Sequence, residues 1–144
     1  MATGIQVVFD CADPRRMAAF WAAALGYTEQ APPDGFESWQ AWLRDAGIPE
    51  ERWNDANAVV DPVGVGPRLF FQRVPETKAV KNRVHLDLNV GGGRAAPHDD
   101  RVRRVDAEID RLLALGATRH RVFEERGEYW VAMLDPEGSE FDLQ

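Results

Sequence analysis

The stretch KNRVHLDLNV, residues 81–90, holds the side chains best suited to chemistry. A strand places alternate side chains on opposite faces, so His85 and Asp87 share one face and the other face carries Val84, Leu86, Leu88 and Val90. An imidazole on a face with carboxylates can bind a metal ion, transfer a proton or simply hydrogen-bond to a neighbouring carboxylate. The residue types leave all three roles open.

Two similar segments of the chain position these side chains. Residues 5–13 alternate as a strand does, and a helix is predicted to begin with Asp13 as its N-cap and to end at Gly26. After the stretch described above, an apolar stripe through residues 102–113 predicts a second helix that ends at Gly116. The sequence therefore repeats one plan of strand followed by helix.

Two turns extend this repeat. VVDPVG at 59–64 corresponds to MLDPEG at 133–138, and each places a Pro/Gly turn between apolar, strand-like runs. Each half is thus predicted to contain a strand, a helix and two or three further strands. The polar, glycine-rich residues 91–100 are interpreted as a surface loop in the second half.

Residues 36–57 interrupt the first half. They are predicted to contain a short amphipathic helix that ends near Gly47, from the spacing of Phe36, Trp39, Trp42 and Leu43. Three of the five tryptophans of the chain lie in this insert. They can form a local core, or they can wall a ligand site by stacking on a flat molecule.

Composition excludes several classes of partner. The net charge of −7 disfavours nucleic acid and anionic lipid surfaces. No run approaches the ~20 apolar residues of a membrane span, and the N-terminus goes directly into a strand pattern. The single Cys11, which belongs to the apolar face of its strand, cannot form an internal disulfide. We therefore expect a cytoplasmic protein without nucleic-acid or membrane partners.

The duplicated βαβββ plan resembles the vicinal oxygen chelate superfamily of glyoxalases, bleomycin resistance proteins and dioxygenases. FDCADPRRMAAFWAAALGY, RLFFQRVPE and DPEGSEF resemble, more narrowly, the actinobacterial branch of glyoxalase-like domain proteins. The resemblance implies an α+β fold in one domain, 1–144, with module one at 1–75, module two at 82–144 and the insert at 36–57. It also implies a cup-shaped mixed sheet, with helices on the convex face and the ligand or metal on the concave face.

Polar residues are expected to line that concave face. If helices cover the apolar alternate positions, the opposite face carries Gln6, Asp10, His85, Asp87, Glu140 and Asp142. Buried polar groups need partners, so such a face is better explained by a polar ligand, water or a metal than by a dry core.

Metal-using relatives draw their ligands from the first and closing strands of each module. This resemblance places ligands at Gln6, His85 and Asp142, and a fourth at either Phe70 or Gln72. The set Gln6, Gln72, His85 and Asp142 would suit Ni, Co, Mn, Fe or Zn. An iron ring-cleaving dioxygenase needs two histidines on this face, and the sequence supplies one.

Three functions follow from the resemblance. The leading one is a glyoxalase/bleomycin-resistance-like protein that binds a small polar or aromatic molecule without a tightly held metal, through Gln6, Asp10, Phe70, Gln72, His85, Trp39 and Trp42. The alternative is a metal-dependent isomerase, epimerase or lyase that acts through an enolate or enediolate, with a proton moved by Asp142, Glu140 or Asp87. The third is a non-catalytic regulatory or assembly module. Relatives also lead us to expect a homodimer.

Overall fold

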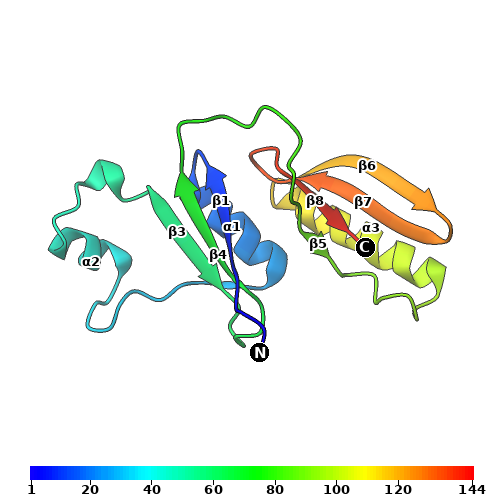
Figure 1. The fold of residues 1–144 in the computed structure, drawn as a ribbon, viewed down its shortest axis with the longest axis horizontal. Coiled ribbons are helices and arrows are strands. Elements are labelled where there is room, and N and C mark those ends of the chain that lie inside the picture. Colours follow the sequence, from blue (N-terminus) through cyan, green and yellow to red (C-terminus); the bar gives the residue numbers. More distant parts are fainter. The chain divides into compact units, whose positions relative to one another are not determined.

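The computed structural model describes residues 1–144 and divides them into two compact units, Met1–Thr77 and Lys78–Gln144. Each unit contains one four-stranded sheet with a long helix packed against it. Figure 1 shows these elements in chain order. None of the helices is long and apolar enough to cross a membrane.

The first unit contains the first repeat and the insert. Its elements are β1 (Gln6–Cys11), α1 (Pro14–Leu25), β2 (Thr28–Glu29), α2 (Trp39–Asp45), the 3-10 helix η1 (Glu50–Arg52), β3 (Ala56–Val60) and β4 (Arg68–Arg73). The strand order is β1-β4-β3-β2, with β1 parallel to β4 and the other neighbours antiparallel. Figure 1 shows α2 and η1 on the β3 side of this sheet.

The second unit repeats this arrangement without the insert. Its elements are β5 (Asp87–Leu88), α3 (His98–Ala114), β6 (Thr118–Glu125), β7 (Glu128–Leu134) and β8 (Glu140–Leu143). The strand order is β5-β8-β7-β6, with β5 parallel to β8 and the other neighbours antiparallel. The two sheets share one order and one set of directions, which confirms the predicted α+β fold built from tandem βαβββ modules.

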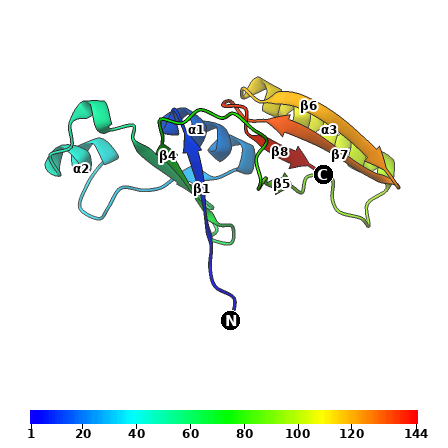
Figure 2. The same cartoon turned by 45° about the horizontal axis from the view of Figure 1, so that its top comes forward.

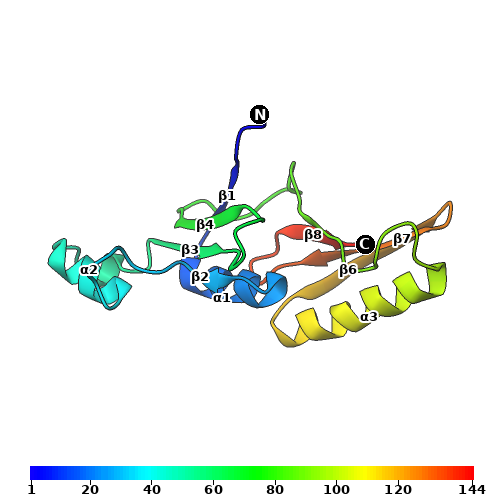
Figure 3. The same ribbon diagram turned by 90° about the horizontal axis from the view of Figure 1, so that it is seen from below.

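Local sequence explains the first helix. The Asp13 side chain accepts a hydrogen bond from the backbone N–H of Arg16 at 3.2 Å, and Gly26 ends the helix with a φ of 70°. The buried side of α1 includes Met17 and Trp21. The Trp21 ring lies 5.1 Å from that of Phe9 in β1, so α1 covers one face of the sheet (Figure 3).

The helix of the second unit begins earlier than predicted. α3 starts at His98, so the last three residues of the predicted loop 91–100 are helical. Asp99 and Asp100 lie in its first turn, where negative charge is favourable next to the helix N-terminus. The buried side of α3 then packs against the second sheet through Val105, Ile109 and Leu112 (Figure 3).

The strand around His85 is shorter than predicted. Its pairing to β8 starts where Leu86 accepts a hydrogen bond from the N–H of Asp142 at 2.9 Å. Val84 was assigned to the apolar face, but it is 81% exposed. The reason is that β8 begins only at Glu140, so no strand or helix covers Val84.

The two predicted Pro/Gly turns are built alike. Asp61 accepts hydrogen bonds from the backbone N–H groups of Val63 and Gly66, and Asp135 accepts them from Glu137 and Ser139. Such aspartate turns fix the chain reversal that leads into β4 and β8. The residues before β1 start at the same end of the first sheet as the Asp61 turn, and they extend away from the sheet (Figure 2).

Candidate functional site

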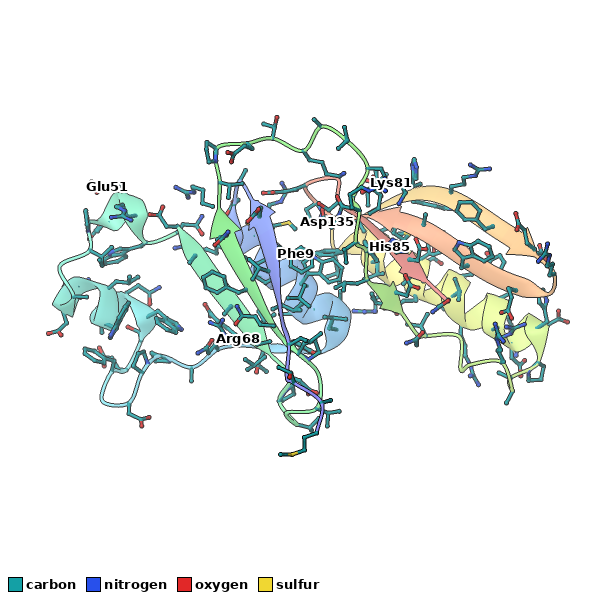
Figure 4. All side chains as sticks on the ribbon, viewed as in Figure 1. Phe9, Glu51, Arg68, Lys81, His85 and Asp135 are labelled. Carbon is teal, nitrogen blue, oxygen red and sulfur yellow. The ribbon has the colours of Figure 1, made fainter.

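His85 lies between two carboxylates in the second unit. Its Nε2 is 3.2 Å from Asp87 Oδ1 and 3.4 Å from Asp142 Oδ2. The parallel register places Asp87 of β5 opposite Asp142 of β8, and Figure 4 shows His85 beside β8. One donor atom from each of the three residues lies within 4.8 Å of the others. We call His85, Asp87 and Asp142 the carboxylate–histidine cluster.

The carboxyl group of Asp142 in this cluster has a raised pKa. Its side chain is 19% exposed. Burial raises its pKa and so does the negative charge of Asp87, while His85 and Lys81 oppose this rise. A carboxylate with a raised pKa is a stronger base than an ordinary one, and such groups are concentrated at functional sites.

Glu140 has other partners. Its carboxylate lies 3.0 Å from Lys78 Nζ and accepts a hydrogen bond from the backbone N–H of Asn82 at 3.0 Å. Burial raises the pKa of Glu140, but the hydrogen bond from the Asn82 N–H and the charge of Lys78 outweigh this effect. The net result is a pKa of about 2. The carboxylate therefore fastens the segment before His85 to β8. Its lowered pKa makes it a weaker base than Asp142.

Replacing this carboxylate gives a pH-dependent prediction. Glu140→Gln should lower the free energy of unfolding at pH 7 by about 1–3 kcal/mol, because it weakens hydrogen bonds made to a charged group. The folded pKa is depressed from 4.5, so this stabilisation is complete above pH 4.5 and is lost as the pH falls towards about 2. Urea unfolding at several pH values measures the difference.

The exposed carboxylate of Glu125 in β6 provides a control for this variant. Glu125→Gln should leave stability nearly unchanged at every pH. A loss for Glu140→Gln that stays constant from pH 7 to pH 2 would contradict the charge-based explanation.

A polar pocket of about 590 Å³ adjoins the cluster. Asp87 and Asp142 line it, together with Asn89, Gly93, Arg94, Arg101, Glu128, Tyr129, Trp130 and Gln144. Tyr129 donates its hydroxyl to Asp106 at 2.8 Å. Burial and this carboxylate raise the pKa of Tyr129 to about 12, so the phenol stays neutral. The pocket leaves room for a polar molecule next to the cluster.

The predicted polar residues of the first unit are engaged with one another. Gln6 Oε1 accepts a hydrogen bond from Arg68 at 2.6 Å, and Gln72 donates one to Asp10 at 2.7 Å. The register pairs Gln6 with Arg68 and Asp10 with Gln72, so Gln6 and Gln72 lie four residues apart along the strands. That offset is about 13 Å. The structure therefore separates two of the four residues predicted as metal ligands.

The insert and the first sheet enclose a second, more apolar pocket. It has a volume of about 300 Å³, and its walls include Trp39, Trp42, Trp53 and Phe70. Leu43, Ile48, Ala56, Ala58, Arg15, Glu29, Gln40, Arg52, Asn54, Asp55, Asn57 and Arg68 complete the lining. We call it the aromatic pocket. It brings together three residues that the sequence suggested as ligand-binding, Trp39, Trp42 and Phe70.

The indoles of this pocket are held by local contacts. Ser38 caps α2 by accepting a hydrogen bond from the N–H of Ala41 at 3.1 Å, so the predicted helix begins at Trp39 and Phe36 lies outside it. The Trp39 indole N–H donates to the carbonyl of Gln30 at 2.7 Å, and the Trp53 N–H donates to Ile48 at 2.8 Å. These bonds satisfy the polar ends of two rings and orient their apolar surfaces.

Sequence reasoning missed Arg68 as a residue of this pocket. The alternation in RLFFQR was the available signal, since it places Arg68, Phe70 and Gln72 on one face and Leu69 and Phe71 on the other. The structure confirms that alternation: Leu69 and Phe71 are buried, with exposures of 1% and 0%. Arg68 lies over the Phe70 ring, 5.0 Å from its centroid.

The duplicated sheet and its open polar face define the class of protein. Two tandem βαβββ modules are the architecture of the glyoxalase/bleomycin resistance/dioxygenase, or vicinal oxygen chelate, superfamily. The chain belongs to the family described as glyoxalase-like domain, whose model matches residues 6–144. No curated protein matches the sequence at a significant level.

Solved structures with this fold cover almost the whole chain. A glyoxalase/bleomycin resistance protein/dioxygenase family enzyme from Burkholderia phytofirmans is 18% identical, with a TM-score of 0.60 over 96% of this chain and 94% of that chain. A glyoxalase-related enzyme from Fulvimarina pelagi is 14% identical, with a TM-score of 0.60 over 99% and 87%.

A fosfomycin resistance protein, FosX, from Listeria monocytogenes is 12% identical, with a TM-score of 0.61 over 100% of this chain and 90% of that chain. That structure is of a mutant complexed with Mn(II) and 1S,2S-dihydroxypropylphosphonic acid. At these identities, the three structures establish the fold alone.

Proposed function

We propose that this protein binds a small, flat organic molecule in the aromatic pocket, in the manner of a bleomycin-resistance-type binding protein without a tightly held metal. The observation that carries the proposal is the convergence of Trp39, Trp42 and Trp53 from the insert with Phe70 from the open face of β4. Concavities of about 300–1,000 Å³ that combine aromatic walls with polar groups are typical of small-molecule sites.

The position of the insert supports this role over a purely structural one. None of the residues of α2 or η1 is fully buried, so the segment has no closed core of its own. Trp39 and Trp42 lie edge to face, with centroids 5.7 Å apart, and both belong to the pocket wall. A flat ligand would cover aromatic surface that is otherwise left partly exposed.

Fluorescence titration tests the binding role. A panel of small neutral, anionic and cationic aromatic compounds should include members that quench tryptophan emission and raise the melting temperature. A compound present at 100 times its Kd adds about 2.7 kcal/mol to stability. Trp42→Leu should weaken binding by about tenfold through lost ring contact.

Trp130→Leu is the matched control, because Trp130 belongs to the second unit and stacks on Phe123 at 4.9 Å. It should leave the affinity unchanged. A panel without any binder, or equal losses in both tryptophan variants, would contradict the assignment to the aromatic pocket.

A second candidate function is a metal-dependent isomerase, epimerase or lyase, which the carboxylate–histidine cluster favours. One imidazole and two carboxylates form a nitrogen and oxygen donor set that suits Mn, Fe, Co, Ni or Zn. Their donor atoms already lie within 4.8 Å of one another, so the residues present fit a divalent ion. Such an ion supplies Lewis-acid polarisation of a substrate oxygen.

The chain's own residues add two features to that candidate. The raised pKa of Asp142, which burial and Asp87 cause, lets its carboxylate hold a proton more readily than an ordinary aspartate. The adjoining polar pocket offers room for a substrate. Chelator-treated protein should then melt at a higher temperature when one of these metals is added, and a flat response to all five would contradict this candidate.

Two finer assignments belong to the same proposal. FDCADPRRMAAFWAAALGY and DPEGSEF support placing the chain in the actinobacterial branch of the glyoxalase-like domain proteins. A homodimer stays a prediction from the same resemblance. The net charge of −7 continues to argue against nucleic acid as a partner.

A further inference from the structure

We infer that the aromatic pocket is selective for aromatic carboxylates, whose ring contacts the indoles and Phe70 while the carboxylate binds the guanidinium of Arg68. This inference rests on the proposed binding function and names its ligand class. The observation behind it is a fixed arginine whose charge no carboxylate of the chain neutralises.

Arg68 is held in place by neutral groups. Its Nε donates to Gln30 Oε1 at 2.6 Å, and its Nη1 donates to Gln6 Oε1 at 2.6 Å. Both acceptors are side-chain amides, so they orient the guanidinium without cancelling its positive charge. The guanidinium carbon, Cζ, also lies 5.0 Å from the centroid of the Phe70 ring. Figure 4 shows Arg68 on β4.

This arrangement leaves donors for a ligand. A guanidinium carries five N–H groups, and the two bonds to Gln30 and Gln6 use one each. The second terminal nitrogen, Nη2, has no hydrogen-bond partner in the chain. A fixed, half-buried guanidinium with free donors suits a carboxylate, which accepts such bonds with charge assistance.

The other charged residues of the pocket are compatible with an anion. Asp55 is paired with Arg52 at 2.9 Å and with Arg73 at 3.6 Å, so its negative charge is already compensated. Glu29 accepts a hydrogen bond from Asn57 at 3.3 Å, and the exposed Arg15 adds a further cation to the lining. The cations of the lining therefore outnumber its acids.

The walls determine which anion fits. Indole and phenyl rings around a space of about 300 Å³ favour a flat apolar body over a phosphate or sulfate, which would need several cations or backbone N–H groups. The Arg68 guanidinium lies over the Phe70 ring, so a ligand ring that contacts the indoles and the edge of Phe70 brings its carboxylate to the guanidinium. The ligand class is thus an aromatic ring bearing one carboxylate.

Naphthoate and naphthamide of the same ring isomer test this selectivity, because they share the ring and differ in charge. Calorimetric titration of the full chain should show naphthoate binding about tenfold to a hundredfold more tightly than naphthamide. Arg68→Gln should remove this preference by weakening naphthoate while leaving naphthamide nearly unchanged.

Arg121→Gln is the matched control. Arg121 lies over the Phe123 ring at 4.8 Å in the second unit. The substitution therefore removes an arginine–phenylalanine contact outside the aromatic pocket. It should leave both affinities unchanged. If Arg68→Gln melts too low for titration, Arg68→Lys replaces it, and the preference should shrink because an ammonium lacks the planar fork.

The outcomes separate this inference from the binding role. Equal binding of naphthoate and naphthamide to the native protein would overturn the inference and leave the proposed function standing. A parallel loss of both affinities in Arg68→Gln, or tighter binding of naphthylmethylamine than of naphthoate, would also overturn it. Failure of every aromatic probe to bind would instead contradict the proposed function itself.

Discussion

Phe71→Ala should lower the free energy of unfolding by about 3–5 kcal/mol, because it opens a cavity in the core of the first unit. Phe71 is 0% exposed, and its ring stacks on that of Phe9 with centroids 5.1 Å apart. Domains of this size are stable by only about 5–15 kcal/mol, so this one truncation removes a large part of the total. Urea unfolding followed by circular dichroism and tryptophan emission measures the loss.

Phe70→Ala provides the matched comparison. Phe70 is the preceding residue of β4, and it lies on the opposite face, in the wall of the aromatic pocket. We expect a stability loss of about 1 kcal/mol or less, since the Phe70 ring is partly exposed and the Arg68 guanidinium lies over it. Ligand affinity should fall instead. Similar stability losses in both variants would contradict the assignment of the two faces.

The fold could be predicted from the sequence because its signals are local and occur twice. Asp13 and Gly26 mark the ends of α1, and both act as predicted. The turns at Asp61 and Asp135 bind their own backbone N–H groups, so they form without help from distant residues. The duplication then supported the resemblance to the vicinal oxygen chelate superfamily, which implied two tandem βαβββ modules.

Parts of the fold that depend on distant partners were predicted less well. The alternation around His85 predicts a strand from Val84, but strand pairing is limited by the start of β8 at Glu140, because strand length depends on the partner strand. The start of α3 was missed for a local reason. The glycines and polarity of residues 91–100 predict a loop. The helix nevertheless begins at His98, because a proline and two acidic residues favour a helix start there.

The candidate site shows the same division. The neighbourhood of His85 with Asp87 and Asp142 followed from strand parity and the repeat, and it is confirmed. The contact of Gln6 with Arg68 did not follow, since it depends on the register between β1 and β4, which no local pattern specifies. The ligand, a bound metal and the homodimer stay predictions.

Asp142→Asn should have opposite effects on the metal-free and metal-loaded protein. In metal-free protein the variant should be the more stable one at pH 7, because burial and the nearby charge of Asp87 disfavour the Asp142 carboxylate and raise its pKa. A raised pKa means that the folded state binds the proton more tightly than the unfolded state. The advantage of Asn therefore disappears as the pH falls below 3.8, where the aspartate is protonated in both states.

Divalent metal should reverse this order if the cluster binds it. The native protein gains about 2.7 kcal/mol at a metal concentration of 100 times its Kd, whereas Asp142→Asn loses a ligand oxygen and should need at least about tenfold more metal. Melting curves of chelator-treated protein with and without Mn or Zn measure both effects. Asp110→Asn, at an exposed position of α3, should change neither. If the variant is less stable than the native protein without metal, Asp142 stabilises the fold itself. If the variant is more stable without metal and less stable with it, Asp142 lowers the stability of the metal-free fold and contributes to metal binding.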